Sequence, residues 1–441
     1  MGGVIRGQGS VWADDGNTTK IDGHYVVNAF VNYDIGGGWI GTLNVNNVAD
    51  KVFPTGGGGF VNGSASVFGA GPELGRTINA GVRWEVEFPR RVVGNKQNSF
   101  DPVAINPVSG TPGVVTFAGV NGTPERAFKT DWNNVGPRLG FAYRVPGKGE
   151  TVIRGGGGVF FGPTVSNTIG DVASLGFSTS ASYSVAQAET QSSFRLRDGF
   201  PAYSRPPLSA GFGAVAVGQK PNTSVAFFNP DQVAPISYQF NLSVQREVAR
   251  DLLMEIGYLG NVSHHLTAND LSLNQVAPKN MTSGNAQLVR PYPQFNNVTW
   301  INPSIGNSTY HGGFIRAEKR FSGGLSFLTH YTFSKFLDDV ESANEYGSTG
   351  SYMDAYNRRL DKGRSGSDVP HRLVVTLLYE VRRFKGNRAV NAALGGWKLG
   401  ILETAESGPA FTVTTLANTT NAFPAGSLRP NLLRLLRSPR G

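Results

Sequence analysis

The first candidates for chemistry are clustered acidic side chains, because carboxylates are the usual ligands of calcium. Asp338, Asp339, Glu341 and Glu345 lie close together in the sequence and could bind calcium or a cationic ligand. Their spacing differs from that of an EF-hand loop. We therefore interpret this cluster as a solvated acidic loop and assign no metal site to it.

Histidines are the second candidates, because imidazole is a common metal ligand. His264 and His265 are adjacent, and His311 and His330 follow later in the chain. Neighbouring residues of a strand point to opposite faces, so the first two do not form a ready ligand pair. We expect surface histidines rather than a metal centre.

Catalytic and nucleotide-binding patterns are weak in this sequence. The glycines from Gly155 to Gly158 are not followed by the Lys-Ser/Thr and the helix of a phosphate loop. No Gly-x-Ser-x-Gly elbow stands out, and no paired carboxylates lie in an apolar context. We therefore expect no enzyme, no catalytic residue and no cofactor.

The most regular charged residues lie between Tyr310 and Phe336. Arg316, Glu318 and Arg320 alternate with mostly apolar neighbours, and His330 lies on the polar face of the next alternating run, beyond a Ser-Gly-Gly turn. Such alternation around a short glycine turn predicts a β-hairpin. Each arm has about ten residues, enough to cross a bilayer as a tilted strand. Because charges are costly in lipid, we expect these four side chains to face a wet lumen.

This alternation returns along the chain. It recurs near residues 25–34, 39–46, 77–88, 138–145, 151–161, 238–248, 252–258, 373–381, 397–405 and 411–415. Between the runs, short turns alternate with long stretches that lack a period, at 50–75, 89–134, 162–235, 261–309 and 338–370. Outer-membrane barrels are organised in this way, with long extracellular loops and short periplasmic turns. The predicted fold is an all-β, antiparallel transmembrane barrel.

Aromatic residues on the apolar faces fit this prediction. Tyr143, Tyr258, Tyr331 and Trp397 are candidates for the aromatic girdles that mark the two membrane surfaces. A soluble β-sandwich also alternates. It would not fill one face of most strands with Leu, Ile, Phe, Tyr and Val.

Composition narrows the function classes. The chain has 441 residues, no cysteine and only 16% charged residues. Its net charge of +9 is scattered, and no recognition motif accompanies it, so nucleic-acid binding is not expected. No apolar run is long enough for a transmembrane helix. The N-terminus lacks the apolar region of a secretory signal, so we expect a fragment or a start that lies upstream.

Several motifs in order resemble a known family. They include RLGFAYRVPGKGETVIRGGGGVFF, YQFNLSVQREV, EKRFSGGLSFLTHYTFSK and SGPAFTV. Together they resemble the TonB-dependent outer-membrane receptors over roughly residues 78–433. More narrowly they resemble the Oar-like subfamily, which carries a carboxypeptidase-regulatory-like domain. The resemblance implies an outer-membrane barrel with a plug domain inside it and energy drawn from the TonB complex.

The chain departs from the family pattern in two ways. No plug or TonB box is visible in the sequence. Residues 1–88 resemble strands that normally close such a barrel, whereas residues 89–441 resemble its central strands and are truncated at the C-terminal side. The order indicates either a natural permutation or fusion, or a join of two gene pieces, and we favour a join or a fragment over a working permutation.

The expected function is binding and uptake of a large nutrient, such as a siderophore or an oligosaccharide, at the bacterial outer membrane. The expected partners are outer-membrane lipid, the extracellular nutrient, and the TonB complex through a plug absent from this sequence. The alternatives are a passive porin, a surface adhesin, or a secreted soluble β-rich binding protein.

Overall fold

The structure of the protein is a computed structural model. The described residues are 2–8, 11–12, 20–21, 24–36, 39–46, 54–55, 59–60, 64–73, 76–89, 91–146, 151–163, 172–178, 196–199, 207–280, 286–340, 352, 354–382, 388, 395–411 and 413.

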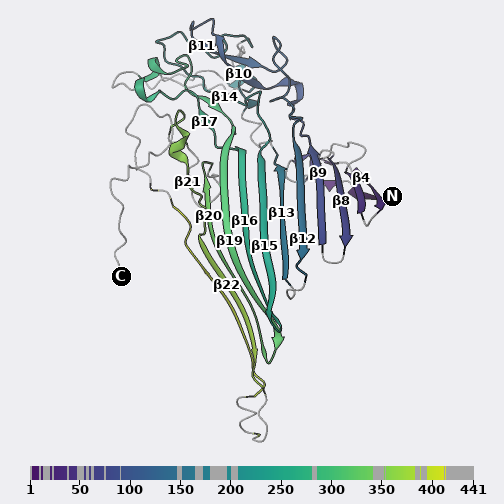
Figure 1. Cartoon of the computed structure of the whole chain (residues 1–441). Helices are drawn as coiled ribbons and strands as arrows, with labels where there is room; N and C mark the ends of the chain where they lie inside the picture. Colours follow the sequence, from purple (N-terminus) through teal and green to yellow (C-terminus); the bar gives the residue numbers. More distant parts are fainter. Residues whose placement is uncertain are drawn as a thin grey trace, which may run out of the picture.

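Most of the strands form one large sheet, called the wall below. It has 14 strands in the order β1-β4-β5-β8-β9-β12-β13-β15-β16-β19-β20-β22-β23, with β21 paired to β20. Figure 1 shows its long strands side by side. Their bounds are β1 (Gly2–Gln8), β4 (His24–Gly36), β5 (Trp39–Asn46), β8 (Ser64–Glu73), β9 (Arg76–Glu85), β12 (Val135–Arg144), β13 (Thr151–Phe161), β15 (Ile236–Ala249), β16 (Leu252–Thr267), β19 (Ser304–Ser322), β20 (Leu325–Asp338), β21 (Gly363–Arg364), β22 (His371–Glu380) and β23 (Lys398–Glu406).

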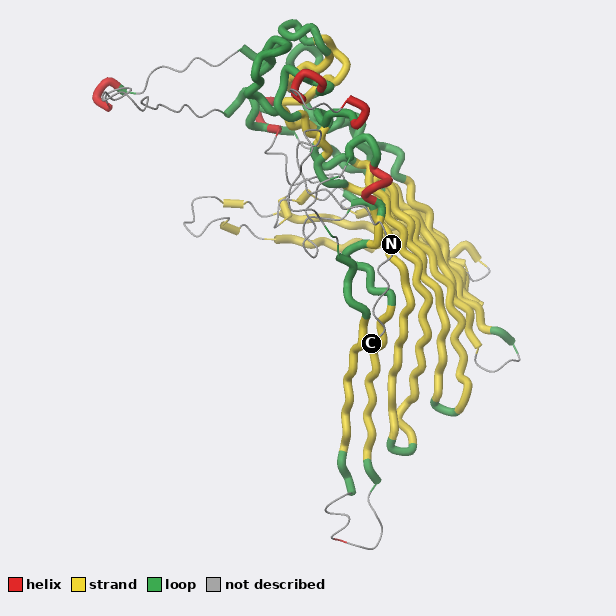
Figure 2. The backbone as a smooth tube through the Cα atoms, turned by 90° about the vertical axis from the view of Figure 1, so that its left-hand side faces the viewer, coloured by secondary structure: helices red, strands yellow, loops and turns green. Residues whose placement is uncertain are grey.

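All neighbouring strands of the wall are antiparallel, as the alternating sequence predicts. Strand β9 pairs with β12 from Trp84 opposite Val135 to Arg76 opposite Tyr143, so the strands before residue 88 continue into the same sheet. Among the described residues β1 and β23 stand at the two ends of the sheet and are not paired with each other. The wall is therefore a curved sheet that does not close into a ring (Figure 2).

The central hairpin forms as predicted, with β19 and β20 joined at Gly323 and Gly324. Both glycines have positive φ, at 63° and 89°. This conformation is unfavourable for residues with a Cβ, which explains why the turn contains a glycine pair. A Cβ on Gly324 would also lie 2.7 Å from the backbone oxygen of Glu380.

The segments between the strands fold into a second body at the opposite end from the short turns, called the cap below (Figures 1 and 2). Its described parts are residues 89, 91–134, 172–178, 196–199, 207–235, 268–280, 286–303, 352, 354–362 and 365–370. It contains β10 (Asn98–Ile105), β11 (Pro112–Phe117), β14 (Val225–Phe227), β17 (Leu271–Ser272), β18 (Val298–Trp300) and the short 3-10 helices η1 (Val93–Asn95), η2 (Leu196–Asp198), η3 (Pro278–Asn280), η4 (Ala286–Val289) and η5 (Arg358–Asp361). Strands β10 and β11 form a hairpin, and β14-β18-β17 form a three-stranded sheet.

The cap contains the hydrophobic core. Among the described residues, every buried apolar side chain lies in the cap rather than in a wall strand. One cluster joins segments that are far apart in the chain: Phe100, Val115, Phe117, Val225, Phe227, Phe295 and Val298. A second cluster joins Ala127, Phe128, Val172, Phe228 and Ile301. The cap is thus a small packed unit built from several inter-strand segments.

Several stretches interpreted as loops are therefore more ordered than expected. Residues 89–134 contain the hairpin β10–β11, and residues 50–75 contain β8 as well as β6 (Pro54–Thr55) and β7 (Gly59–Phe60). The N-terminal stretch before residue 25, for which no alternating run was predicted, contains β1, β2 (Val11–Trp12) and β3 (Lys20–Ile21). Conversely, Phe411 and Val413 lie in no strand, and the rest of the short run predicted at 411–415 lies outside the described residues. In the part of the chain that is described, no helix is long and apolar enough to span a membrane.

Candidate functional site

The pairing register brings the predicted polar residues of the central hairpin together. Arg316 lies directly opposite Glu255 on β16 and directly opposite His330 on β20. Opposed residues of an antiparallel pair share a face, and so do residues two apart on one strand, which adds Glu318. Arg320 follows near the end of β19 and is exposed. This face is called the polar face below. Its position against a lumen remains a prediction.

Arg316 links two carboxylates on the polar face. Its Nη2 donates to Glu318 Oε2 at 2.6 Å, and its Nη1 lies 3.8 Å from Glu255 Oε2. The Glu255 side chain is only 15% exposed, so solvent screens this ion pair less than one between fully solvated groups. The result is a small charged network that spans two strands.

His330 contributes a ring contact to the polar face, whereas its neighbours Arg316 and Glu318 contribute an ion pair. Its ring stacks on Phe314, with centroids 5.3 Å apart and planes 19° apart. The ring of Phe314 covers Gly257, where a Cβ would collide with it. Glycine at that position therefore lets an aromatic ring lie flat on the polar face beside the ion pairs.

Further polar pairs continue across the wall in the same alternation. Arg154 donates to Gln245 at 2.6 Å, Arg83 pairs with Glu85 at 2.5 Å, and Arg372 lies 3.5 Å from Glu406. The last pair joins directly opposed residues of β22 and β23. Polar pairing is thus a property of the whole face and is not confined to one hairpin.

The other face of the same strands, called the apolar face below, carries exposed hydrophobic side chains. Leu139 is 57% exposed, Ile256 59% and Ile401 54%. Three such residues on separate strands would be costly in water, but they suit contact with lipid chains. The two faces therefore suit two different solvents.

All four candidate girdle residues occupy positions on the apolar face. Tyr143 stands one residue from the end of β12, and Trp397 immediately precedes β23, both beside the short-turn end. Tyr258 and Tyr331 each lie six residues into their strands, β16 and β20. Their roles as girdle residues stay predictions, but two heights along the strands are represented.

Sequence reasoning missed an aromatic cluster beside the cap. Trp84 stacks on Trp132 with centroids 6.0 Å apart, and Phe88 packs edge-on against Trp132 at 5.7 Å. The Trp84 indole N–H donates to the Trp132 carbonyl at 2.9 Å. Trp84 belongs to the apolar alternation of β9. Trp132 falls in a stretch without a period, so no pattern in the sequence could have joined the two.

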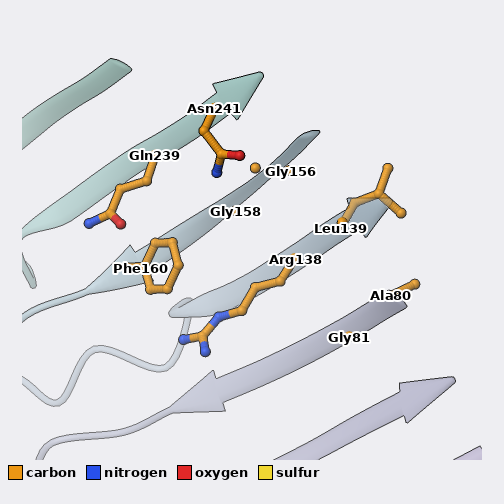
Figure 3. Close-up of a pocket in the computed structure, with 11 residues that line it drawn as sticks. Ala80, Gly81, Arg138, Leu139, Gly156, Gly158, Phe160, Gln239 and Asn241 are labelled. Carbon is orange, nitrogen blue, oxygen red and sulfur yellow. The ribbon is translucent and has the colours of Figure 1, made fainter. Parts of the chain in front are cut away.

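A glycine-floored hollow of about 290 Å³ lies on the polar face across β9, β12, β13 and β15 (Figure 3). Its floor contains Gly81, Gly140, Gly156 and Gly158. The register pairs Gly140 with Gly156 and places Arg138 between Gly158 and Gly81. A Cβ at Gly158 would lie 2.9 Å from Arg138 Cγ, so glycine leaves room for the arginine to lie along the sheet.

The hollow offers a hydrogen-bond donor, the Arg138 guanidinium, beside glycines that carry no side chains. The Arg138 guanidinium lies over the Phe160 ring, 4.3 Å from its centroid, and its buried Nε has no partner among the described residues. Gln239 and Asn241 add amide groups at the β15 side. This arrangement suits a carboxylate or a backbone carbonyl of a segment that approaches closely.

The acidic and histidine clusters considered as metal sites are dispersed. Asp339 accepts from the backbone of Asn307 and pairs with Arg358 at 3.3 Å, while Glu341 and Glu345 lie outside the described residues. His264 bonds to Asn307 at 2.8 Å, and His265 has a φ of 55° at a register shift of β16. Across the described ranges, no group of three His, Cys, Asp or Glu residues could hold a metal ion.

Together these observations define a class: an antiparallel β-sheet with one apolar and one polar face. A family model for the outer membrane beta barrel domain matches residues 74–440, which is most of the chain. The chain belongs to this family, and it is a protein of the bacterial outer membrane. This result excludes the secreted soluble alternative.

The solved structures that match the chain include outer-membrane transporters and a receptor. The FrpB iron transporter from Neisseria meningitidis is 10% identical, with a TM-score of 0.41 over 88% of this chain and 44% of that one. The outer membrane transporter YddB from Escherichia coli is 10% identical, with 0.36 over 88% and 47%. The hemophore receptor HasR from Serratia marcescens is 12% identical, with 0.36 over 81% and 49%. The chain spans less than half the length of each, and no curated protein matches it.

Proposed function

We propose that the chain is the barrel part of a TonB-dependent outer-membrane receptor of the Oar-like kind, which binds and takes up a large nutrient such as a siderophore or an oligosaccharide. Residues 1–88 would contribute strands that close such a barrel, and residues 89–441 its central strands. The TonB complex would act through a plug domain that this sequence does not contain.

The observation that carries the proposal is the polar face beneath a folded cap. Arg316, Glu318, Arg320 and His330 would line a wet lumen, and the cap would meet the ligand with segments from 162–235, 261–309 and 338–370. A cap with its own packed core offers a preformed surface, which lowers the ordering cost of binding.

The glycine-floored hollow supports the same proposal. A plug inside a barrel must touch the polar face, and a floor without side chains permits close approach of backbone. Arg138 could then donate to a carboxylate or carbonyl of the plug.

The test of function uses the intact gene in its own cells. We expect deletion to abolish uptake of one member of a panel of ferric siderophores and oligosaccharides, and loss of TonB to have the same effect. Uptake that persists without TonB would indicate a passive porin. A deletion that changes cell attachment but no uptake would indicate an adhesin.

A separate test asks which face of the wall contacts water. The chain contains no cysteine, so an introduced cysteine is the only thiol that a maleimide can label. The matched variants are Glu318→Cys and Ala317→Cys, neighbours on β19 that point to opposite faces. We expect a water-soluble maleimide to label the first after insertion into vesicles and a lipid-soluble maleimide to label the second. The reverse pattern would contradict the lumen assignment.

A further inference from the structure

Two histidines on the apolar face share one local arrangement. The Tyr258 hydroxyl lies 2.5 Å from Nδ1 of His311, and the Tyr331 hydroxyl lies 2.7 Å from Nδ1 of His371. In both cases the tyrosine lies on the preceding wall strand, and its directly opposed residue, Gly313 or Leu373, is two positions from the histidine. Because the same geometry occurs on two separate strand pairs, we infer that the two Tyr–His pairs have the same role.

The tyrosine bond to Nδ1 fixes the direction of each imidazole ring and leaves Nε2 as the free ring nitrogen. With the hydroxyl as donor, Nδ1 accepts and the proton of the neutral ring is on Nε2. Among the described residues Nε2 of His311 and of His371 has no hydrogen-bond partner, and both side chains are exposed. In this tautomer, and equally in the protonated ring, Nε2–H is a donor that points outward.

His264 differs in a way that makes it a natural contrast. Its Nδ1 lies 2.8 Å from Oδ1 of Asn307, whose amide nitrogen donates to Asp339 at 3.0 Å and to the Ile305 carbonyl at 3.2 Å. The amide is thereby oriented with its oxygen toward the histidine, so Nδ1 is the donor. The neutral ring then carries no proton on Nε2.

Lys335 completes the group. It lies directly opposite His311, two residues beyond Phe333 on β20, and Phe333 is directly opposite His371. Its side chain is exposed and has no bonded partner in the described part of the chain. Three donors, one of them a full positive charge, thus lie on three adjacent strands of the apolar face.

Their height along the strands places them at headgroup level. Lys335 stands ten residues from Leu325, where β20 begins at the short-turn end. At about 3.3 Å per residue and a tilt of about 40°, this distance corresponds to about 25 Å of height, which matches the apolar band of an outer-membrane barrel. Donors at this level face lipid headgroups rather than acyl chains.

We propose that His311, Lys335 and His371 form an outward-facing site for the phosphate of a lipid headgroup in the leaflet on the cap side. Phosphate offers the oxygen acceptors that N–H donors and an ammonium need. Tyr258 and Tyr331 are positioning residues, because each bonds to Nδ1 of its histidine and so orients the ring with Nε2 free to meet the phosphate.

The test uses the full chain refolded in detergent micelles, with native mass spectrometry to count retained lipid. Phosphatidic acid is the probe, and diacylglycerol, with the same acyl chains and no phosphate, is the comparison lipid. We expect retention of phosphatidic acid only. The variant His311→Gln/Lys335→Gln/His371→Gln should weaken retention about tenfold or more, since bonds to charged groups are the strong ones.

The matched control is His264→Gln/Lys319→Gln, a histidine and a lysine elsewhere on the apolar face, which should retain the lipid unchanged. Lys335→Met alone suits a lipid-facing position, so it keeps the test valid if the triple variant fails to fold. Tyr258→Phe/Tyr331→Phe should weaken retention where Tyr143→Phe does not. Equal retention of diacylglycerol, an unchanged triple variant, or full displacement by millimolar inorganic phosphate would each overturn the proposal.

Discussion

The wall and the cap use apolar side chains in opposite ways. In the cap, Phe295 and Val298 are fully buried, and Phe100 packs between Phe227 and Phe295. In the wall, other large apolar side chains, such as those of Leu139 and Ile256, are more than half exposed. The cap turns its apolar residues toward its own interior, as a soluble protein does, whereas the wall turns them outward toward lipid.

The difference shows that hydrophobic placement is set by the solvent on each side. A sheet in a membrane needs no interior core, because lipid covers its apolar face and its backbone groups bond between strands. A unit in water must bury its apolar surface against itself. One chain meets both requirements by alternating with period two in the wall and by joining distant segments in the cap.

The largest expected effect is a cavity in the cap. Phe295→Ala removes a fully buried ring from the core cluster, so the cap should lose about 3–5 kcal/mol of stability. Limited proteolysis should then cleave the cap quickly, while heat-modifiable gel migration shows that the wall still folds. Val93→Ala, at a 90% exposed cap position, is the control and should change little. Equal damage to wall and cap would remove the distinction between them.

A charge on the apolar face is the matching change in the wall. Val244 lies mid-strand on β15 and is opposed by Ile256 and Ile153. Val244→Arg should destabilise the wall by about 2–4 kcal/mol, because lipid does not solvate the guanidinium. The control Thr376→Arg puts the same charge at an exposed position of the polar face. Refolding yield and urea midpoint in vesicles should fall for the first variant alone.

Breaking the ion pairs of the polar face should cost less. Glu255→Gln leaves Arg316 with Glu318 as its partner, so we expect a loss of about 1 kcal/mol or less. A double-mutant cycle with Arg316→Gln measures the coupling directly. A loss as large as that of Val244→Arg would mean that this face is dry, which contradicts a lumen.

The smallest effect concerns pH and the cap. Burial raises the pKa of the Tyr352 hydroxyl above its ordinary value. The folded cap therefore favours the protonated form, and its stability is unaffected below the ordinary tyrosine pKa of about 10 and falls as pH rises beyond it. Tyr352→Phe should reduce the extra protease sensitivity of the cap between pH 9 and pH 11. An unchanged pH profile in this variant would assign the effect to another group.

Period-two alternation was enough to predict most strands of the wall, although β1 and β8 were not among the predicted runs. The hairpin around Gly323 and Gly324, the shared face of Arg316 and Glu318, and the apolar position of Tyr331 all follow from local pattern and turn chemistry. These features depend on neighbours within one strand pair, which a sequence displays directly.

The cap could not be predicted in the same way. Phe100 meets Phe227 and Phe295 only after the wall brings their segments together, and the segment containing Phe100 shows no period of its own. The hollow around Arg138 also depends on register, because glycines on three strands must line up before they form a floor. Such features depend on how strands and segments pair with one another, and the sequence of a single segment does not show this.

The parallel pairing of β14 with β18 has a consequence for movement. It joins the segment between β13 and β15 to the segment between β16 and β19, and the β10–β11 hairpin packs onto the same cluster. No single segment can swing aside without exposing the core that the others complete. If a large solute passes this end of the molecule, we therefore expect the cap to move as a single unit. Independent movements of its separate segments would not suffice.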